Sequence, residues 1–223
     1  RVRHELRLAA PTERGGGLYL SRSRVQMNGD IVINNSSQID GGGIYLFQLS
    51  HAILRNLILA HNQAHQDGSA LMLEDSYADI AHATIADNDG NSGIFNSMRR
   101  LYPLSSSHIS ITNTVLVRHT VGITSTAGST VMGSGILWFG NGANTGGEGT
   151  YQLSNQIDGD PAFVADTYRI GPSSAARDAG IPTDVFDDID DEPRPYLAPD
   201  LGADEYWPDG LPVQLFAPLF FRQ

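Results

Sequence analysis

The feature that most constrains this chain is an internal repeat of small-residue turns, each followed by a short apolar segment. The first apolar residue after each turn falls at Leu18, Ile44, Leu71, Ile94 and Ile123. Subtraction of these positions gives spacings of 26, 27, 23 and 29 residues. A unit of this length cannot bury its apolar face alone, whereas stacked units form a continuous core. The repeat therefore predicts a solenoid.

A second apolar segment recurs in each unit, after a variable polar link. It reads DIVINN from Asp30, NLILAHN from Asn56, HATIADN from His82 and NTVLVRH from Asn113. Both segments alternate apolar and polar residues, as strands with one buried face do. The coil length and the irregular links, without a six-residue or leucine-rich period, favour a right-handed form. We predict an all-β fold, a right-handed single-stranded parallel β-helix with an irregular C-terminal capping module.

Asparagines occupy the same place in three successive units, directly after the second apolar segment, at Asn35, Asn62 and Asn88. Asparagine tolerates the left-handed backbone conformation of a sharp corner. Its side-chain amide both donates and accepts hydrogen bonds, so equivalent residues in a stack can bond to one another. We therefore expect a structural ladder of amides rather than catalytic residues.

Four segments follow from this pattern. Residues 1–14 are expected to form a partial coil or cap, residues 15–149 the coils, residues 150–207 a separate C-terminal module, and residues 208–223 an apolar tail. Two uses are open for the tail: addition as a strand to a neighbouring molecule, or packing on its own domain. The apolar side chains that would serve in assembly are Val213, Leu215, Phe216, Leu219, Phe220 and Phe221.

Composition excludes several classes of function. The net charge of −11 opposes binding to nucleic acid, because a phosphate backbone repels an acidic surface. The 223 residues include no cysteine, so the chain forms neither a disulfide nor a thiolate metal site. No apolar run in the sequence reaches the length that a membrane-spanning helix needs.

The C-terminal third carries the most specific motifs. The run DPAFVADTYRIGPSSAARDAG begins at Asp160, and DDIDDEPRPYLAPDLGADEY begins at Asp187. Both runs resemble the end of the choice-of-anchor Q domain of bacterial β-helix proteins, while the glycine-rich units resemble the repeats of polymorphic outer-membrane proteins. Two residues depart from the family pattern: Asp191 stands in place of a glycine, and Arg177 in place of an apolar residue. The resemblance implies a secreted or surface-displayed bacterial protein without one established activity.

Parallel β-helices also include polysaccharide lyases and glycosidases, so an enzyme is the rival hypothesis. A polygalacturonase needs paired carboxylates, but no Gly-His-Gly motif is present and Asn113-Thr114 is followed by valine instead of aspartate. A lyase needs a basic residue beside carboxylates that hold calcium. The candidate bases, none of which has a matching acidic cluster in the coils, are Arg22, Arg24, Arg55 and Arg118. We expect no catalytic residue.

An acidic run in the C-terminal module is the candidate metal site. Its residues are Asp187, Asp188, Asp190 and Asp191. Carboxylate oxygens suit calcium, and this ion is the one cofactor considered. The alternative, which we favour, is a rigid turn in which Arg194 pairs with these carboxylates.

Four aromatic residues are the candidates for contact with sugar rings. They are Tyr19, Tyr45, Phe47 and Tyr77. Aromatic faces in a row would offer a stacking surface for a polysaccharide. We favour the alternative, in which the rings point inward or stack on one another as a structural ladder.

These patterns favour a non-enzymatic structural or adhesive β-helix protein, secreted or displayed on a bacterial cell surface. Each end of a solenoid is an unpaired sheet edge, so the ends and the tail predict self-association into head-to-tail filaments or a surface layer. The alternative is a carbohydrate-active β-helix that binds or cleaves an extracellular polysaccharide. Neither a nucleic-acid partner nor a membrane span is expected.

Overall fold

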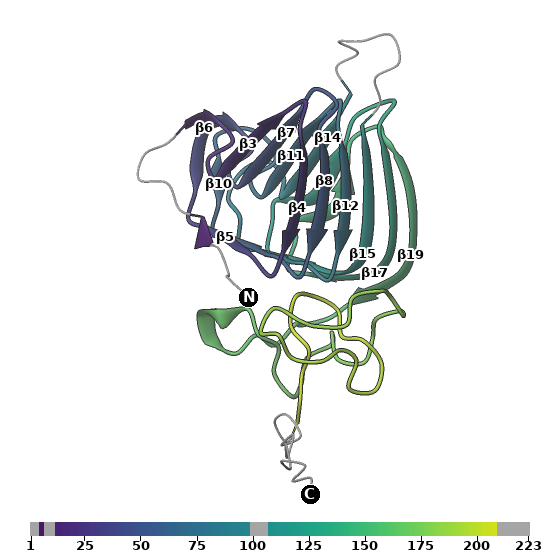
Figure 1. Cartoon of the computed structure of the whole chain (residues 1–223). Helices are drawn as coiled ribbons and strands as arrows, with labels where there is room; N and C mark the ends of the chain where they lie inside the picture. Colours follow the sequence, from purple (N-terminus) through teal and green to yellow (C-terminus); the bar gives the residue numbers. More distant parts are fainter. Residues whose placement is uncertain (1–4, 7–11, 99–106, 209–223) are drawn as a thin grey trace, which may run out of the picture.

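The chain folds into a parallel β-solenoid of about five turns (Figure 1). The structure is a computed structural model that describes residues 5–6, 12–98 and 107–208. The prediction of an all-β parallel β-helix is confirmed. Among the described residues the only helical element is a 3-10 turn at Ala165–Thr167, so none of them forms a helix suited to crossing a membrane. The tail residues from Val213 to Phe221 lie outside the described ranges.

One sheet contains the first strand of each unit. Its members are β3 (Leu18–Ser21), β7 (Ile44–Phe47), β11 (Leu71–Glu74), β14 (Ile94–Ser97), β16 (Val121–Ser125) and β18 (Ala143–Gly146). The register of this sheet joins the five repeat markers into a single row, each marker being the partner of the next. The row ends at Thr145, which lacks the apolar side chain that marks the earlier turns.

A larger sheet contains the remaining strands of each turn in two halves. The first half contains β4 (Arg24–Asn28), β8 (His51–Arg55) and β12 (Tyr77–Ala81). The second half contains β1 (Glu5–Leu6), β5 (Ile31–Ile33), β9 (Ile58–Ala60) and β13 (Thr84–Ala86). Three long strands cross both halves: β15 (His108–Val117), β17 (Thr130–Phe139) and β19 (Thr150–Asp158). A small third sheet consists of β2 (Thr12–Arg14), β6 (Ser36–Asp40) and β10 (Gln63–Ala64).

Strand β19 extends the stack beyond the boundary predicted at residue 149. It pairs in parallel with β17, so the solenoid continues to Asp158. The sequence pattern did not reveal this strand, because its end position leaves polar residues exposed where earlier turns bury apolar ones. At the other end of the stack, β1 and β2 add strands to β5 and β6.

Each turn bends sharply between the two halves of the larger sheet. The backbone φ angle is positive there, at Gly29, Asn56, His82, Asn113, Gly135 and Asn155. Glycine adopts this left-handed conformation without strain, and asparagine tolerates it better than most residues. The sequence therefore repeats a conformational requirement in each turn, even though the residue type changes.

The predicted asparagines lie at a second corner, inside the solenoid. Asn35 Nδ2 donates to Asn62 Oδ1 at 3.0 Å, and Asn62 Nδ2 donates to Asn88 Oδ1 at 3.0 Å. The row continues to His119, whose Nε2 lies 3.2 Å from Asn88 Nδ2. The N–H of His119 then donates to Asn141 Oδ1 at 2.9 Å. The ladder therefore has five rungs, two more than the sequence pattern revealed.

The left-handed conformation at this corner belongs to the residue before each rung. The residues concerned are Asn34, His61, Asp87, Arg118 and Gly140. The expectation that the ladder asparagines adopt it themselves is wrong. The preceding residue turns the chain, and the rung then points its side chain into the interior, where its amide bonds to the next turn.

Substitution of Asn62 by alanine tests the ladder. The backbone N–H and the Nδ2 of Asn35 would lose Asn62 Oδ1 as their acceptor, and Asn88 Oδ1 would keep only the backbone N–H of residue 62. Each buried polar group left unsatisfied costs about 1–3 kcal/mol. We expect a correspondingly lower free energy of unfolding, measured from the urea dependence of circular dichroism. Gln63→Ala is the matched control, because the neighbouring side chain is exposed and bonds only at the surface to Asp89. An equal decrease in the free energy of unfolding in both variants would contradict a stabilising role of the ladder.

Candidate functional site

The C-terminal module lies along one side of the solenoid, across several turns (Figure 1). It does not cap an end, so this part of the prediction is corrected. A second apolar core joins its residues Tyr168, Ile170, Ala176, Ile189, Leu201 and Ala203 to outward side chains of β9, β13, β15 and β17. The burial of strand β15 shows where the module packs. Its first five residues alternate between partly and fully buried, whereas its last five, which the module covers, are all buried.

Corner residues of three successive turns hold the module. The pairs are Asn113 with Ile181, His82 with Thr183, and Asn56 with Asp187. Asn113 makes two of these bonds, donating to Ile181 O at 2.7 Å and accepting the Ile181 N–H at 2.9 Å. Segment 181–187 therefore runs back along the solenoid, opposite to the order of the turns. Because the three corner residues that bind this segment belong to different turns, the module lies along the side of the solenoid rather than over an end.

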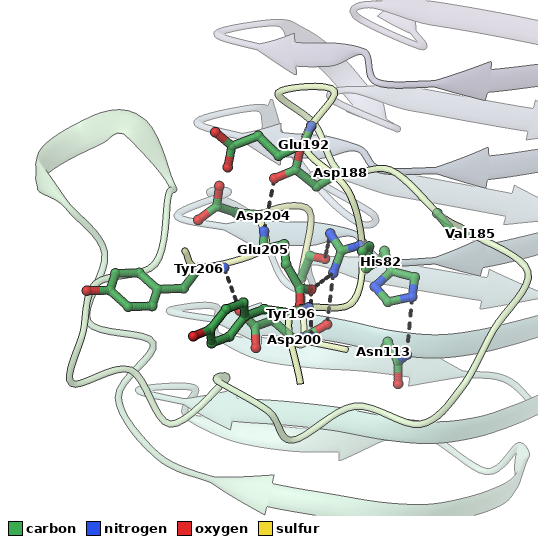
Figure 2. A network of polar contacts seen from close by, with 12 residues as sticks. His82, Asn113, Val185, Asp188, Glu192, Tyr196, Asp200, Asp204, Glu205 and Tyr206 are labelled. Atoms are coloured by element: carbon green, nitrogen blue, oxygen red, sulfur yellow. Dashed lines mark hydrogen bonds and ion pairs between the residues drawn. The ribbon is translucent and has the colours of Figure 1, made fainter. Parts of the chain in front are cut away.

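A buried ion pair organises the rest of the module. Arg194 Nη1 lies 3.0 Å from Glu205 Oε2, and neither side chain is accessible to solvent. Glu205 also accepts the N–H groups of Tyr196 and Asp200, at 2.8 and 2.9 Å. Figure 2 shows Glu205 and Asp200 gathered with Asp188 beside His82 of the solenoid. The expected pairing of Arg194 with the acidic run is therefore wrong, since its carboxylate partner lies in the later GADEY motif.

Most of the acidic run serves as a rigid turn. Asp188 Oδ1 accepts the N–H groups of Asp190 and Glu192 at 2.7 and 2.8 Å. Asp190 is bonded to Arg169 by both carboxylate oxygens. Asp191 has a φ of 63°, the left-handed conformation that suits the glycine of the family pattern. These contacts favour the structural alternative for the run.

Three carboxylates approach the geometry of a metal site. One oxygen each from Asp188, Asp190 and Asp204 lies within 4.8 Å of the others, and no other such group occurs in the described ranges. Asp187 and Asp191 are not part of it, and Asp204 was missed because it lies in a later motif. Arg169 Nε is 3.8 Å from Asp204 and bonded to Asp190, so a guanidinium supplies the positive charge. Calcium takes roughly six to eight oxygens, and most oxygens of these three carboxylates already accept N–H groups of the protein; calcium at this place stays a prediction.

Burial controls the charge of several groups at these corners. It lowers the pKa of His82 to about 2 and that of His119 to about 4, so both imidazoles are neutral. Burial also raises the pKa of Asp204 from 3.8 to about 7, and the neighbouring Asp188 and Asp190 add to this rise. The two histidines therefore act as neutral hydrogen-bonding rungs in positions that asparagine fills elsewhere.

The four aromatic candidates do not form one exposed strip. Tyr45 is 1% exposed, stacks on Tyr19 with ring centroids 5.3 Å apart, and donates to Glu74 at 2.5 Å. Phe47 stacks on Tyr45 at 6.0 Å, so these three rings form a structural ladder. Tyr77 lies in the other sheet, on β12, and meets His51 edge-on at 6.4 Å. A sugar-stacking strip built from all four residues is therefore wrong.

The first half of the larger sheet has an outward face that the module leaves uncovered. Its first row contains Arg24, His51, Tyr77, His108, Thr130 and Thr150. Three surface depressions, of about 450, 310 and 410 Å³, lie on or beside this face. They lie around Arg55 and segment 184–187, along β15, β17 and β19, and around Arg24 and His51. This face is the candidate site for a ligand.

No known protein family, curated protein or solved structure matches this chain. The class that the fold defines is the parallel β-solenoid, with a side module and one uncovered sheet face. The stacked sheets alone do not identify a reaction, because one fold supports many activities.

Substitution of Arg194 by methionine tests the role of the buried ion pair. Glu205 would remain buried without its partner, a change that typically costs about 3–5 kcal/mol. We expect amide hydrogen exchange to accelerate in residues 160–208 while the ladder of the solenoid stays protected. Arg177→Met is the control, because that side chain is partly exposed and contacts Tyr206 and Pro172 at the module surface. Unchanged exchange in the Arg194 variant would refute the assignment.

The raised pKa of Asp204 predicts a pH dependence of stability. The folded state binds this proton more tightly than the unfolded chain, so the stabilisation is complete below about pH 4 and is lost as the pH rises through about 7. Asp204→Asn stays neutral and can still accept the Ile170 N–H, which lies 2.8 Å from the carboxylate. Urea unfolding near pH 5 and near pH 8 should differ less in this variant than in the parent or in the exposed Asp184→Asn control. A difference as large as the parent's would disprove the assignment.

Proposed function

We propose that this chain is a non-catalytic structural protein of the bacterial surface, a β-solenoid that joins other copies end to end. The observation that carries the proposal is the free outer edge of β18 and β19. In the described part of the chain, each of these strands pairs on one side only. Strand β19 has nine residues and exposes six of them. A long strand edge with unpaired backbone groups is a template for another strand.

The opposite end of the stack offers an edge that matches β18 and the first half of β19, whereas β1 already occupies the outer edge of β5. Strands β3 and β4 also pair on one side only among the described residues. Arg24 in β4 and Thr150 in β19 begin and end the same row of the sheet, so a second copy placed in register continues that row.

Strand β19 also lacks the usual protection of an edge. Its sequence, TYQLSNQID, contains neither lysine nor proline, the residues that commonly prevent pairing. Head-to-tail contacts that do not close into a ring produce filaments. End-to-end addition therefore gives a linear polymer of solenoids rather than a closed oligomer.

Two further observations support a non-catalytic surface role. The ionisable groups at the centre of the C-terminal module, Arg194 and Glu205, are inaccessible to solvent and bonded to each other, whereas an acid or base catalyst must reach its substrate. The C-terminal motifs resemble those of choice-of-anchor Q domains, which supports display outside a bacterial cell.

The double variant Thr150→Lys/Gln152→Lys tests assembly at the β19 edge. The added charges would face Arg24 of the next copy, so we expect the mass measured by light scattering to fall to that of the monomer. Negative-stain images should lose any filaments at the same time.

The matched control is Thr130→Lys/Met132→Lys, which places the same charges one strand further inside the stack. This variant should assemble as the parent does. A parent chain that stays monomeric at high concentration, or equal effects of both variants, would overturn the proposal.

A further inference from the structure

We infer that the uncovered face of the larger sheet binds a linear acidic polysaccharide, held along the row that contains Arg24, His51, Tyr77 and His108. This face meets the strand edges at β4 and β19, but most of it lies on strands inside the stack, and the inference does not depend on end-to-end assembly. The row follows the solenoid axis, with one side chain from each turn.

The shape of the face suits an extended polymer. Parallel strands are about 4.8 Å apart, so the row presents a side chain at that regular interval along a straight line. The depression around Arg24 and His51 and the one along β15, β17 and β19 lie at opposite ends of the same face. The C-terminal module packs on the neighbouring half of the sheet and reaches this half only near Asn28 and Arg55, so a chain-like ligand can lie along the first row.

The charge of the row points to an anion. Arg24 is exposed, His51 and His108 are partly exposed, and within the described ranges none of these three side chains has a hydrogen bond or ion pair. The first row contains no acidic residue, although the chain has 25 aspartates and glutamates. Unpartnered donors in one line on an otherwise acidic protein are complementary to carboxylates that recur along a polymer.

Arg55, on the same face, provides a contrast. Its guanidinium donates to Asp79 Oδ2 at 2.8 Å and to the Asp79 carbonyl at 2.9 Å. The charge of Arg55 is therefore already neutralised by a neighbour in the next turn. Anion binding is thus confined to the first row, at the side of the face away from segment 184–187, which lines a depression with Arg55.

The remaining side chains favour a sugar polymer over a nucleic acid. Tyr77 is 38% exposed and lies between the two histidines of the row, where its ring can contact the apolar face of a sugar. Later turns supply hydroxyl and amide groups for sugar hydroxyls, from Thr130, Gln152 and Ser154. The net charge of −11 opposes the dense phosphates of a nucleic-acid double helix more than the carboxylates of a polyuronate, which carries one charge per sugar.

Affinity electrophoresis and calorimetry with polygalacturonate as the probe test the inference. We expect the full chain to bind polygalacturonate more tightly than neutral dextran or single-stranded DNA, with an affinity that falls as salt increases. The double variant Arg24→Gln/His108→Gln should weaken binding about tenfold, because both contacts are charged or strongly polar. Both side chains lie on the outer face, so thermal unfolding should not change.

Arg177→Gln is the matched control, since it removes one positive charge from the C-terminal module and leaves the row intact. It should bind as the parent does. Absence of binding, preference for DNA or dextran, or equal weakening by Arg177→Gln would each overturn the inference. Light scattering on the single variant His108→Gln separates the two proposals, because His108 lies on β15 inside the stack: weaker binding with unchanged assembly concerns this face alone.

Discussion

The structure depends on a polar constraint at its corners. The chain changes direction at a buried corner in each turn, and the buried polar groups of that corner need hydrogen-bond partners. The ladder from Asn35 to Asn141 meets this need by bonding each rung to the next turn. Side-chain amides thereby fix the spacing and register of the turns, and the apolar column between the sheets follows. His119 fits the same position because burial keeps its ring neutral.

The sequence predicted the stack well because its requirements repeat. The markers from Leu18 to Ile123 and the amides at Asn35, Asn62 and Asn88 recur at positions that pair in the structure. The misses in the C-terminal module have a common physical cause, since they concern contacts that do not repeat, whereas β19, His119 and Asn141 were missed because the residue type changes at a repeated position. Glu205 pairs with Arg194 across a loop, and Asp204 meets Asp188 and Asp190 from a later motif. No period in the sequence reveals such contacts.

The C-terminal module gives the two halves of the larger sheet different properties. Where it packs, both faces of the strands are buried, and the sheet is interior structure. Where it does not pack, side chains of every turn remain available to a ligand. The module therefore defines the candidate site indirectly: it covers the outer face of the second half of the larger sheet and leaves the outer face of the first half exposed.

Segment 181–187 has a mechanical consequence. In a simple repeat protein each turn touches only its neighbours, so the stack can fray from an end one turn at a time. This segment is fastened to corners of three turns, at Asn113, His82 and Asn56, and it runs against their order. Opening any one of these turns strains the anchors on the other two. The segment thus couples the unfolding of these three turns, so that they are expected to open together rather than one at a time.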